Sequence, residues 1–272
     1  ALDWTLLSFL VIVILVPLLN VISCSVSRPV AVGAGQVYIW PVGFSLEAYK
    51  KLFMYNAILT GFYNTIIYTV VGTVINIVVT VMCAYPLSRP DIIGKKYVML
   101  YFTFTMLFGG GMIPTYLVIK DLGMINTRWA MLLPGAMGVY NMIVARTFFM
   151  NTIPNEMIEA SQIDGATDFQ VLFKIVLPLS SSLLAVLTLF YAVGHWNSFF
   201  SCYIYIDKAE LWNLQVVLRN FMAYTKQLME SSGISDSIVE GQEAALMQDV
   251  LKYAIIVFTS IPIILLYPLV QK

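Results

Sequence analysis

Residues Tyr63–Ser88 read YNTIIYTVVGTVINIVVTVMCAYPLS, a run without a single Asp, Glu, Lys or Arg. A helix that crosses the hydrocarbon core of a bilayer needs about 20 predominantly apolar residues, and this run exceeds that length. Because lipid offers no partner for free backbone N–H and C=O groups, such a segment is expected to be helical. The stretch therefore predicts a membrane-spanning helix, which Pro86 ends or kinks near its last turn.

Similar uncharged windows recur along the chain and predict an all-α, polytopic membrane helix bundle of about six transmembrane helices in a single domain, 1–272. The fourth window is the weakest, because Pro134, Gly135 and Gly138 interrupt it and Arg146 ends it early, so a buried half-span is its alternative. The six windows run approximately Thr5–Ser27, Tyr63–Ser88, Tyr97–Ile119, Trp129–Ala145, Ser180–Ile206 and Tyr253–Val270.

The composition agrees with burial in lipid. Sixty per cent of the residues are apolar and only 11% are charged, whereas an ordinary soluble domain carries about 25% charged residues. Fifteen basic residues balance fifteen acidic ones, so no nucleic-acid partner is indicated. Cys24, Cys83 and Cys202 stand far apart inside apolar stretches, and we interpret them as small buried residues without a disulfide or metal role.

Four of the connections between the windows are long or polar enough to help assign the faces of the membrane. With six spans, residues 28–62 and the connection that contains 207–249 share one face, while 89–96 and 146–179 share the other. The short loop holds Arg89, Lys95 and Lys96, and short basic loops count most in the positive-inside rule. This weakly favours a cytoplasmic position for 89–96 and an extracytoplasmic one for 28–62 and 207–249.

Asn151–Leu179 has the pattern of two short helices joined by a turn. Acidic residues follow Pro154, as is typical of a first helical turn, and Gly165 suits the positive φ of a helix end. Thr167 and Gln170 have the spacing of a capping box, which predicts that a second helix begins at once. Pro178 predicts the end of that helix or a kink.

The second helix places four apolar residues at i, i+3, i+4 and i+7, and these are Phe169, Leu172, Phe173 and Val176. The helix is too short and too charged to enter lipid. Two interpretations are open from this pattern: the stripe packs beneath the chain's own bundle, or it fills a groove on a partner.

The residues in this segment resemble a known motif. Glu159-Ala160-Ser161, Asp164-Gly165-Ala166 and then Ile175-x-Leu177-Pro178 are similar to the EAA loop of the permease subunits of bacterial ABC importers. Glu159, Gly165 and Pro178 fall at the family's offsets. Ser161 replaces the usual second alanine, an exchange of one small residue for another that should leave docking intact.

The resemblance implies that Asn151–Leu179 faces the cytosol and forms the coupling helix that docks on an ATPase subunit. The residues that it assigns to this coupling site are Glu159, Ala160, Ser161, Asp164, Gly165, Ala166, Phe169, Leu172, Phe173 and Pro178. Glu159 or Asp164 is then expected to pair with basic groups on the ATPase. Movement of the ATPase dimer would reach the flanking spans as a rigid-body push.

Further stretches resemble the maltose-type carbohydrate permeases, in the branch associated with acidic oligosaccharides such as alginate or pectin fragments. They are Gly109–Tyr116, Leu122–Thr127, Trp196-Asn197 and Leu211–Gln215. The resemblance implies a bacterial cytoplasmic membrane protein with three kinds of protein partner: a second, homologous permease, an ABC ATPase dimer and an extracytoplasmic solute-binding protein, the last contacted by the outward loop that contains 207–249.

The chain lacks the phosphate-binding motif Gly-x-x-x-x-Gly-Lys-Ser/Thr. The nearest string, Gly94-Lys95-Lys96, has neither the earlier glycine nor the hydroxyl. We therefore expect a non-catalytic chain that binds no cofactor itself, with ATP and Mg²⁺ on the ATPase.

Polar and aromatic residues within the windows are candidates for a sugar pathway, because intramembrane polar groups are costly and often functional. The candidates are Asn64, Tyr140, Asn141, His195, Trp196 and Asn197. A hydrogen-bonded packing role is the alternative for His195, and tyrosines also gather at membrane interfaces for physical reasons alone.

Two other function classes fit the sequence less well. An ion-coupled secondary sugar transporter usually carries intramembrane acids or bases, and His195 is the only such group deep in the windows. A membrane-embedded enzyme is disfavoured because no nucleophile, base or metal cluster converges there.

Overall fold

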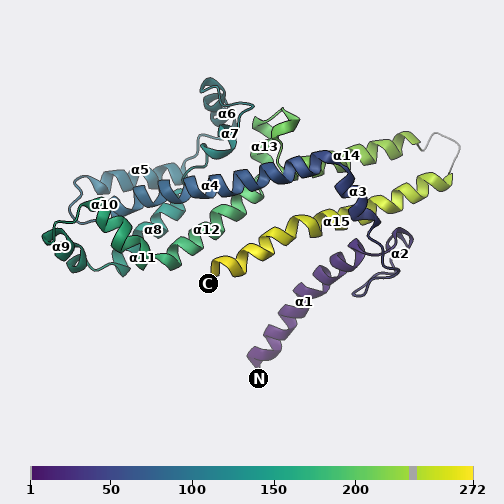
Figure 1. Ribbon diagram of the computed structural model, residues 1–272, viewed down its shortest axis with the longest axis horizontal. Helices are drawn as coiled ribbons and strands as arrows, with labels where there is room; N and C mark the ends of the chain where they lie inside the picture. Colours follow the sequence, from purple (N-terminus) through teal and green to yellow (C-terminus); the bar gives the residue numbers. More distant parts are fainter. Residues whose placement is uncertain (1, 233–237, 272) are drawn as a thin grey trace. The chain divides into compact units, whose positions relative to one another are not determined.

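In the computed structural model, the backbone is described for residues 2–232 and 238–271, and side chains for 4–224, 227 and 246–268. This part of the chain contains helices and no strand, which confirms the predicted all-α class (Figure 1). Residues 233–237 of the predicted outward loop lie outside the described residues. The helices are α1 (Leu2–Ser25), α2 (Pro29–Gly33), α3 (Glu47–Met54), α4 (Asn56–Ser88), α5 (Lys95–Leu107), α6 (Met112–Asp121), α7 (Trp129–Leu132), α8 (Val139–Thr152), α9 (Asn155–Ile163), α10 (Asp168–Val171), η1 (Leu172–Val176), α11 (Leu177–Leu179), α12 (Ser181–Trp196), α13 (Phe199–Tyr205), η2 (Ala209–Leu211), α14 (Leu214–Ser232) and α15 (Ile238–Gln271).

Three helices are long and apolar enough to cross a membrane: α1 over Trp4–Ser25, α4, and α15 over Leu246–Pro268. Two bent pairs raise the number to five if each pair is counted as one span, and these are α5 with α6, and residues 168–179 with α12. The first, second and sixth windows therefore fold as continuous helices, while the other three are broken.

The three breaks fall at glycine, proline or polar residues, which interrupt a regular helix. The third window turns by 113° between α5 and α6, where Gly111 takes a φ of +85°. The fourth is interrupted at 133–138, between α7 and α8, so α8 is a half-length helix as in the alternative interpretation. The fifth stops at Trp196 and resumes at Phe199, beyond the polar pair Asn197-Ser198.

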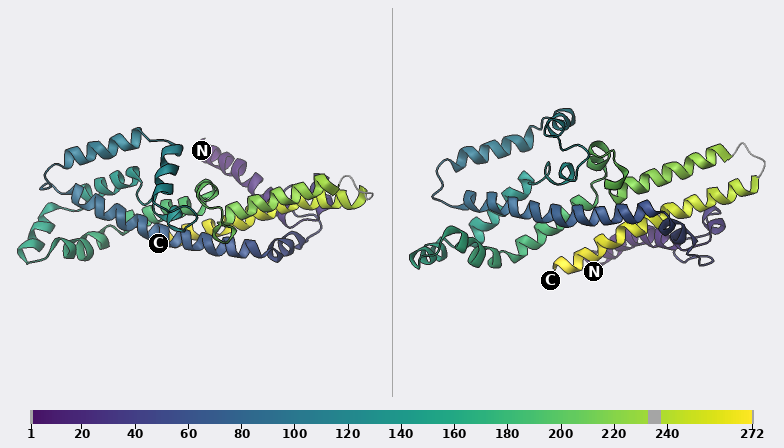
Figure 2. Two further views of the ribbon diagram at one scale, coloured as in Figure 1. Left: turned by 90° about the horizontal axis from the view of Figure 1, so that it is seen from above. Right: turned by 45° about the horizontal axis from the view of Figure 1, so that its top comes forward.

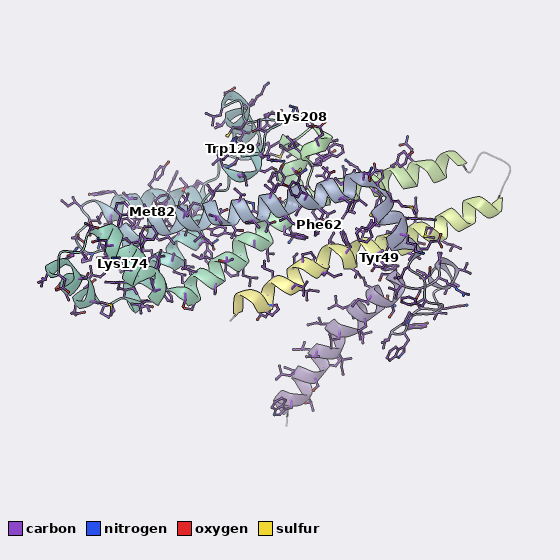
Figure 3. All side chains as sticks on the ribbon, viewed as in Figure 1. Tyr49, Phe62, Met82, Trp129, Lys174 and Lys208 are labelled. Atoms are coloured by element: carbon purple, nitrogen blue, oxygen red, sulfur yellow. The ribbon has the colours of Figure 1, made fainter. Side chains whose placement is uncertain are left out.

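The chain divides into two compact units, Ala1–Phe62 with Asn213–Leu265, and Tyr63–Trp212 with Leu266–Lys272. In the first unit, α3 packs on α15, where Ala48 contacts Met247, Val250 and Leu251. The Phe258 ring lies 5.4 Å from that of Phe53 and 5.5 Å from that of Phe62, measured between centroids. Helix α1 has none of its most apolar window buried (Figure 3), whereas Ser23, Cys24 and Ser25 at its end are buried.

The second unit is built around the C-terminal two thirds of α4. Its core joins α4, α8, α12 and the segment from α9 to α11. Figures 1 and 2 show α9 and α10 at the end where α4 stops, beside the end of α8. The unit therefore attaches the predicted coupling segment directly to the ends of three longer helices.

Candidate coupling segment and the helix contacts behind it

The segment between α8 and α12 folds as the expected helix–turn–helix. Helix α9 begins after Pro154 and ends at Ile163, and Gly165 follows with a φ of +82°. This left-handed conformation is open to glycine and strained for residues with a Cβ. No atom lies within 4 Å of the place that a Cβ on Gly165 would occupy. The turn therefore requires glycine for its backbone conformation and not for lack of space.

Helix α10 begins with the predicted capping box. The Thr167 hydroxyl accepts a hydrogen bond from the Gln170 backbone N–H at 3.4 Å, and the Gln170 side-chain oxygen accepts one from the Thr167 N–H at 2.9 Å. The helix then widens into one π turn, η1, ahead of Pro178. Proline has no N–H and its ring excludes the carbonyl four residues earlier, which favours such widening. The chain turns by 82° into α12, so the kink predicted near Pro178 is observed.

The structure divides the predicted apolar stripe into two faces. Leu172 and Val176 are at most 3% exposed, whereas Phe169 and Phe173 are 62% and 59% exposed. Burying a residue such as Leu or Val is worth about 1.5–3 kcal/mol, so the inner face fixes the segment to the bundle. The residues of this inner core include Tyr85, Ala145, Phe149, Ile158, Val171, Leu172 and Val176. Packing beneath the chain's own bundle thus describes Leu172 and Val176, while the exposed Phe169 and Phe173 leave the other half of the stripe free for a partner.

The motif residues lie mostly on the outer side of the segment. Glu159, Ala160 and Asp164 are exposed. The Ser161 hydroxyl donates to the Ile158 carbonyl at 2.7 Å, which satisfies it within its own helix. Ala166 is partly buried against the inner core. The two carboxylates therefore remain accessible to a partner, as docking requires.

Sequence reasoning used Arg89 only as a topology marker, yet its side chain is 92% buried. Its Nε donates to the Ser88 hydroxyl at 3.1 Å, and its guanidinium lies 5.1 Å from the centre of the Tyr85 ring. Burial lowers the pKa of Arg89, while Tyr85 and the nearby Asp91 act in the opposite direction. Arginine stays protonated in proteins, so a positive charge is held at the cytoplasm-facing end predicted for α4. No cluster of three or more His, Cys, Asp or Glu that would suit a metal occurs in the described part of the chain.

A polar stripe runs along the buried side of α4. Its members Asn64, Tyr68, Asn76 and Thr80 are at most 1% exposed and recur every four residues, with Gly72 completing the series. Spacing of four places residues on one face of a helix. This spacing was visible in the sequence and would have identified the stripe.

At one end of the stripe, two side chains donate hydrogen bonds to backbone carbonyls of the connection after α13. Asn64 donates to the carbonyls of Glu210 and Trp212 at 2.7 and 3.1 Å. The Tyr68 hydroxyl donates to the Leu211 carbonyl at 2.8 Å. Non-helical backbone within a membrane protein must find such internal partners. Asn64 therefore has a structural role here in addition to any contact with substrate.

At the middle of the stripe, Asn76 bonds to the interrupted backbone of the fourth window and also to His195. The Asn76 amide nitrogen donates to the Gly135 carbonyl, which places the amide oxygen 2.7 Å from His195 Nε2. An amide oxygen only accepts, so His195 carries a hydrogen on Nε2. One turn further, Tyr191 shares a 2.7 Å hydrogen bond with Thr80 and accepts from the Gly138 N–H at 3.3 Å. The alternative of a hydrogen-bonded packing histidine describes the observed contacts.

Gly72 allows this close approach of α4 and α12. A Cβ on Gly72 would lie 2.4 Å from His195 Nε2, so the ring would have to move and lose its bond to Asn76. We expect Gly72→Ala to destabilise the chain by about 1–3 kcal/mol, which lowers the thermal midpoint of the detergent-solubilised protein by about 2–4 °C per kcal/mol. Gly194→Ala is the control, because nothing lies within 4 Å of its Cβ; an equal loss in both variants would contradict this packing argument.

The other candidate pathway residues are scattered. Trp196 is buried, and Asn141 is partly buried beneath Gly138. Tyr140 is 61% exposed. Asn197 is exposed and donates to the Val193 carbonyl of its own helix at 3.1 Å. Tyr140 and Asn197 are thus accessible side chains, whereas Asn64, His195 and Trp196 are engaged in packing or hydrogen bonds.

The described residues thus form membrane-length apolar helices with a helix–turn–helix packed between α8 and α12. Residues 76–272 match the family described as "Binding-protein-dependent transport system inner membrane component", and the chain belongs to this family. It is 38% identical over 268 residues to the polygalacturonan/rhamnogalacturonan transport system permease protein YtcP of Bacillus subtilis (strain 168), covering 98% of this chain and 91% of that protein.

Two further similarities agree with this assignment. Protein LplC of Bacillus subtilis (strain 168) is 38% identical over 258 residues, covering 95% of this chain and 85% of its own length. A solved structure, a bacterial ABC transporter involved in the import of the acidic polysaccharide alginate, superposes with a TM-score of 0.86 at 33% identity, covering 99% of this chain and 94% of that one. The resemblance to ABC importer permeases of acidic carbohydrates is confirmed.

Proposed function

We propose that this chain is the transmembrane subunit of an ATP-driven importer in the bacterial cytoplasmic membrane, where it forms half of the translocation pathway for an oligosaccharide. A second, homologous permease supplies the other half. An ABC ATPase dimer docks on Asn151–Leu179 from the cytosol, and an extracytoplasmic binding protein delivers the substrate. ATP and Mg²⁺ bind on the ATPase.

The observation that carries the proposal is the division of the coupling segment into a buried and an exposed face. Leu172 and Val176 fix it to the bundle, while Phe169, Phe173 and the carboxylates of Glu159 and Asp164 are exposed. Aromatic residues that fill a partner's pocket commonly dominate binding energy. An element held in this way transmits a push from its outer face to the helices behind it.

The path of that push is short. The core behind the segment contains residues of α4 and α8, including Tyr85, Ala145 and Phe149. The segment also continues through the bend at Ser180 into α12. Helix α12 is tied to α4 by the bonds of Tyr191 and His195. A displacement of the segment would therefore move α4, α8 and α12 together.

The relatives support a substrate class. The names of two of them specify polygalacturonan or rhamnogalacturonan and alginate, which are polymers of acidic sugars or contain them. This supports an acidic oligosaccharide as the substrate here. The accessible residues Tyr140 and Asn197 remain our candidates for contacts along the pathway, together with Asn64, Asn141, His195 and Trp196.

Reconstitution in liposomes with the partner permease, the ATPase and the binding protein tests the proposal. We expect uptake of oligogalacturonate only when ATP is supplied on the ATPase side, and unchanged uptake when proton and sodium gradients are collapsed. Uptake by the permease alone, driven by a proton or sodium gradient without ATP, would instead establish the ion-coupled secondary transporter.

A further inference from the structure

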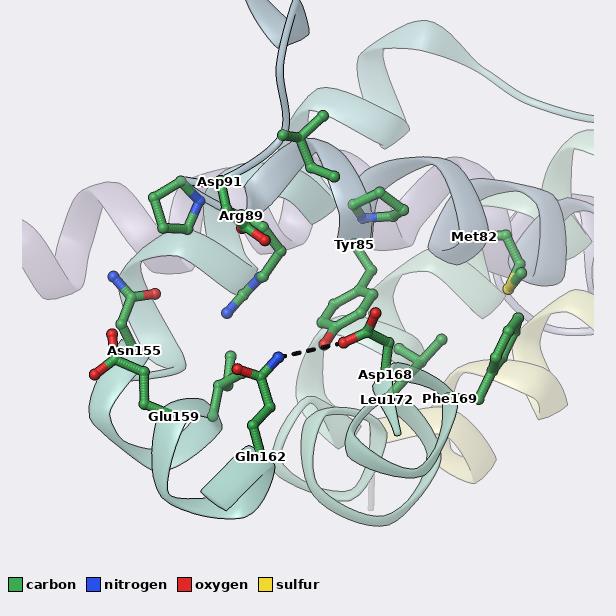
Figure 4. Close-up of a pocket in the computed structure, with 14 residues that line it drawn as sticks. Met82, Tyr85, Arg89, Asp91, Asn155, Glu159, Gln162, Asp168, Phe169 and Leu172 are labelled. Atoms are coloured by element: carbon green, nitrogen blue, oxygen red, sulfur yellow. Dashed lines mark hydrogen bonds between the residues drawn. The ribbon is translucent and has the colours of Figure 1, made fainter. Parts of the chain in front are cut away.

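A cavity of about 340 Å³ lies between the end of α4, the loop after it, and residues of α9 and α10 (Figure 4). Its volume falls at the lower end of the range of about 300–1,000 Å³ that small-molecule sites occupy. It is much larger than one carboxylate side chain needs. The cavity therefore suits a small molecule better than the tip of a single side chain from a partner protein.

One wall carries a buried cation. The Arg89 guanidinium points from the end of α4 toward α9 (Figure 4), and the residue is 8% exposed. Nε is bonded to Ser88, but Nη1 has no hydrogen-bond partner among the described residues. A buried polar group without a partner is costly, and a guanidinium presents its N–H groups in a fork that matches a carboxylate. The cavity is thus prepared for one anionic group.

Carboxylate and amide side chains also line the cavity, and none of them is a cation. Asp91, Glu159 and Asp168 contribute carboxylates, and all three residues are exposed. Asn155 and Gln162 contribute amides, and the Gln162 amide donates to Asp168 at 3.3 Å. Ionised carboxylates only accept hydrogen bonds. They therefore suit hydroxyl groups on a ligand and oppose a second negative charge.

Apolar side chains complete the lining. Met82 and Phe169 lie on the side of the cavity away from Glu159 (Figure 4), and the Phe169 ring is 62% exposed. A free aromatic face suits the C–H side of a sugar ring. One anion-binding fork, several hydroxyl acceptors and an aromatic face together describe a hydroxylated ring that bears a single carboxylate.

We propose that this cavity binds a monomeric sugar acid from the cytosol. The ligand's carboxylate pairs with Arg89, and its hydroxyls donate to Asp91 and Asp168. Bound there, the ligand bridges the end of α4 and the coupling segment and restrains their relative movement, so that accumulated sugar acid slows import. The choice of galacturonate as the ligand and the cytosolic side of the cavity rest on the proposed function.

The test uses the complete permease–ATPase complex without the binding protein. Titration calorimetry with galacturonate should show binding to the wild type and an affinity about 10- to 100-fold lower for Arg89→Gln, because charge-assisted hydrogen bonds are lost. Arg89→Lys should retain part of the affinity. Arg146→Gln is the matched control: Arg146 lies near the same end of α4, donates to the Leu87 carbonyl at 2.8 Å, and does not line the cavity.

Galactose and inorganic phosphate identify the ligand class. We expect galactose, which lacks the carboxylate, and phosphate, which lacks the ring, to bind at least ten times more weakly than galacturonate. Equal galacturonate binding to wild type and Arg89→Gln, equally tight galactose or phosphate binding, or no binding at all would each overturn the proposal. Matching thermal midpoints for Arg89→Gln and the wild type ensure that a loss of affinity is not a loss of folding.

The regulatory effect is measured in proteoliposomes. Galacturonate on the ATPase side should inhibit oligosaccharide uptake by the wild type and not by Arg89→Gln; equal inhibition of both would refute control through this cavity. ATP-driven uptake that galacturonate leaves unchanged would remove this inference and keep the proposed function. An absence of ATP-driven uptake by the wild type would count against the proposed function itself.

Discussion

Replacing Gly165 with valine should abolish ATP-driven uptake while leaving the chain inserted in the membrane. At a φ of +82°, a β-branched residue costs about 1–3 kcal/mol, and the segment relieves that cost by reorienting α9 against α10. Because the coupling contact needs both helices in place, the permease should no longer co-purify with the ATPase. Pull-down of the solubilised complex and uptake in proteoliposomes measure the two effects.

Gly123→Val is the matched control. Gly123 has a φ of +67° and, like Gly165, nothing within 4 Å of its Cβ position, but it follows α6 and lies outside the coupling segment. It should cost similar stability and leave the ATPase bound. If Gly165→Val still bound the ATPase and transported normally, the turn would have no coupling role.

Replacing both Phe169 and Phe173 with serine should strongly lower the affinity of the permease for the ATPase. Both rings are more than half exposed, so the substitution should change the chain's own stability by little, about 0.5 kcal/mol or less for surface positions. Truncating an aromatic anchor at an interface costs about 2 kcal/mol or more, which predicts at least a 30-fold lower affinity for the ATPase. Titration of the ATPase onto nanodisc-embedded permease measures it.

Phe44→Ser provides the comparison for this variant. Phe44 is 68% exposed but lies in the connection before α3. Its loss should leave the affinity for the ATPase unchanged. Equal affinities for the wild type, Phe44→Ser and the Phe169→Ser/Phe173→Ser variant would show that the exposed pair faces lipid or solvent and not the ATPase.

The sequence predicted the helical class and the local form of the coupling segment because both depend on short-range patterns. Uncharged windows identify helices in lipid, and the capping residues Thr167 and Gln170 act over three positions. The expected turn at Gly165 and bend near Pro178 follow from restrictions on single residues. These features needed no knowledge of what packs against them.

The breaks in the windows were harder to predict, because hydropathy does not distinguish a continuous helix from a bent one. Asn197-Ser198 ends α12 although both neighbouring stretches are apolar. The broken backbone near Gly135 is stable since Asn76, 59 residues away, satisfies its carbonyl. Such pairing is set by the tertiary fold and has no local signature.

The sequence pattern also could not predict which individual side chains are buried. Phe169 and Leu172 belong to one predicted stripe, and only packing decides that Leu172 is buried while Phe169 is free. Arg89 counted in the sequence as one loop charge, yet it is enclosed by Tyr85 and residues of α9. A charged residue directly after a membrane helix is normally solvated, so nothing in the sequence singled it out.

Both the coupling role and the importer assignment require that the segment between α8 and α12 lies in the cytosol. Ile163 is 86% exposed in the turn of that segment, so an Ile163→Cys variant, in a background where Cys24, Cys83 and Cys202 are serine, reports the side directly. A membrane-impermeant thiol reagent should label it in inside-out vesicles and not in intact cells, and bound ATPase should protect it. Labelling in intact cells would contradict both the coupling role and the importer assignment.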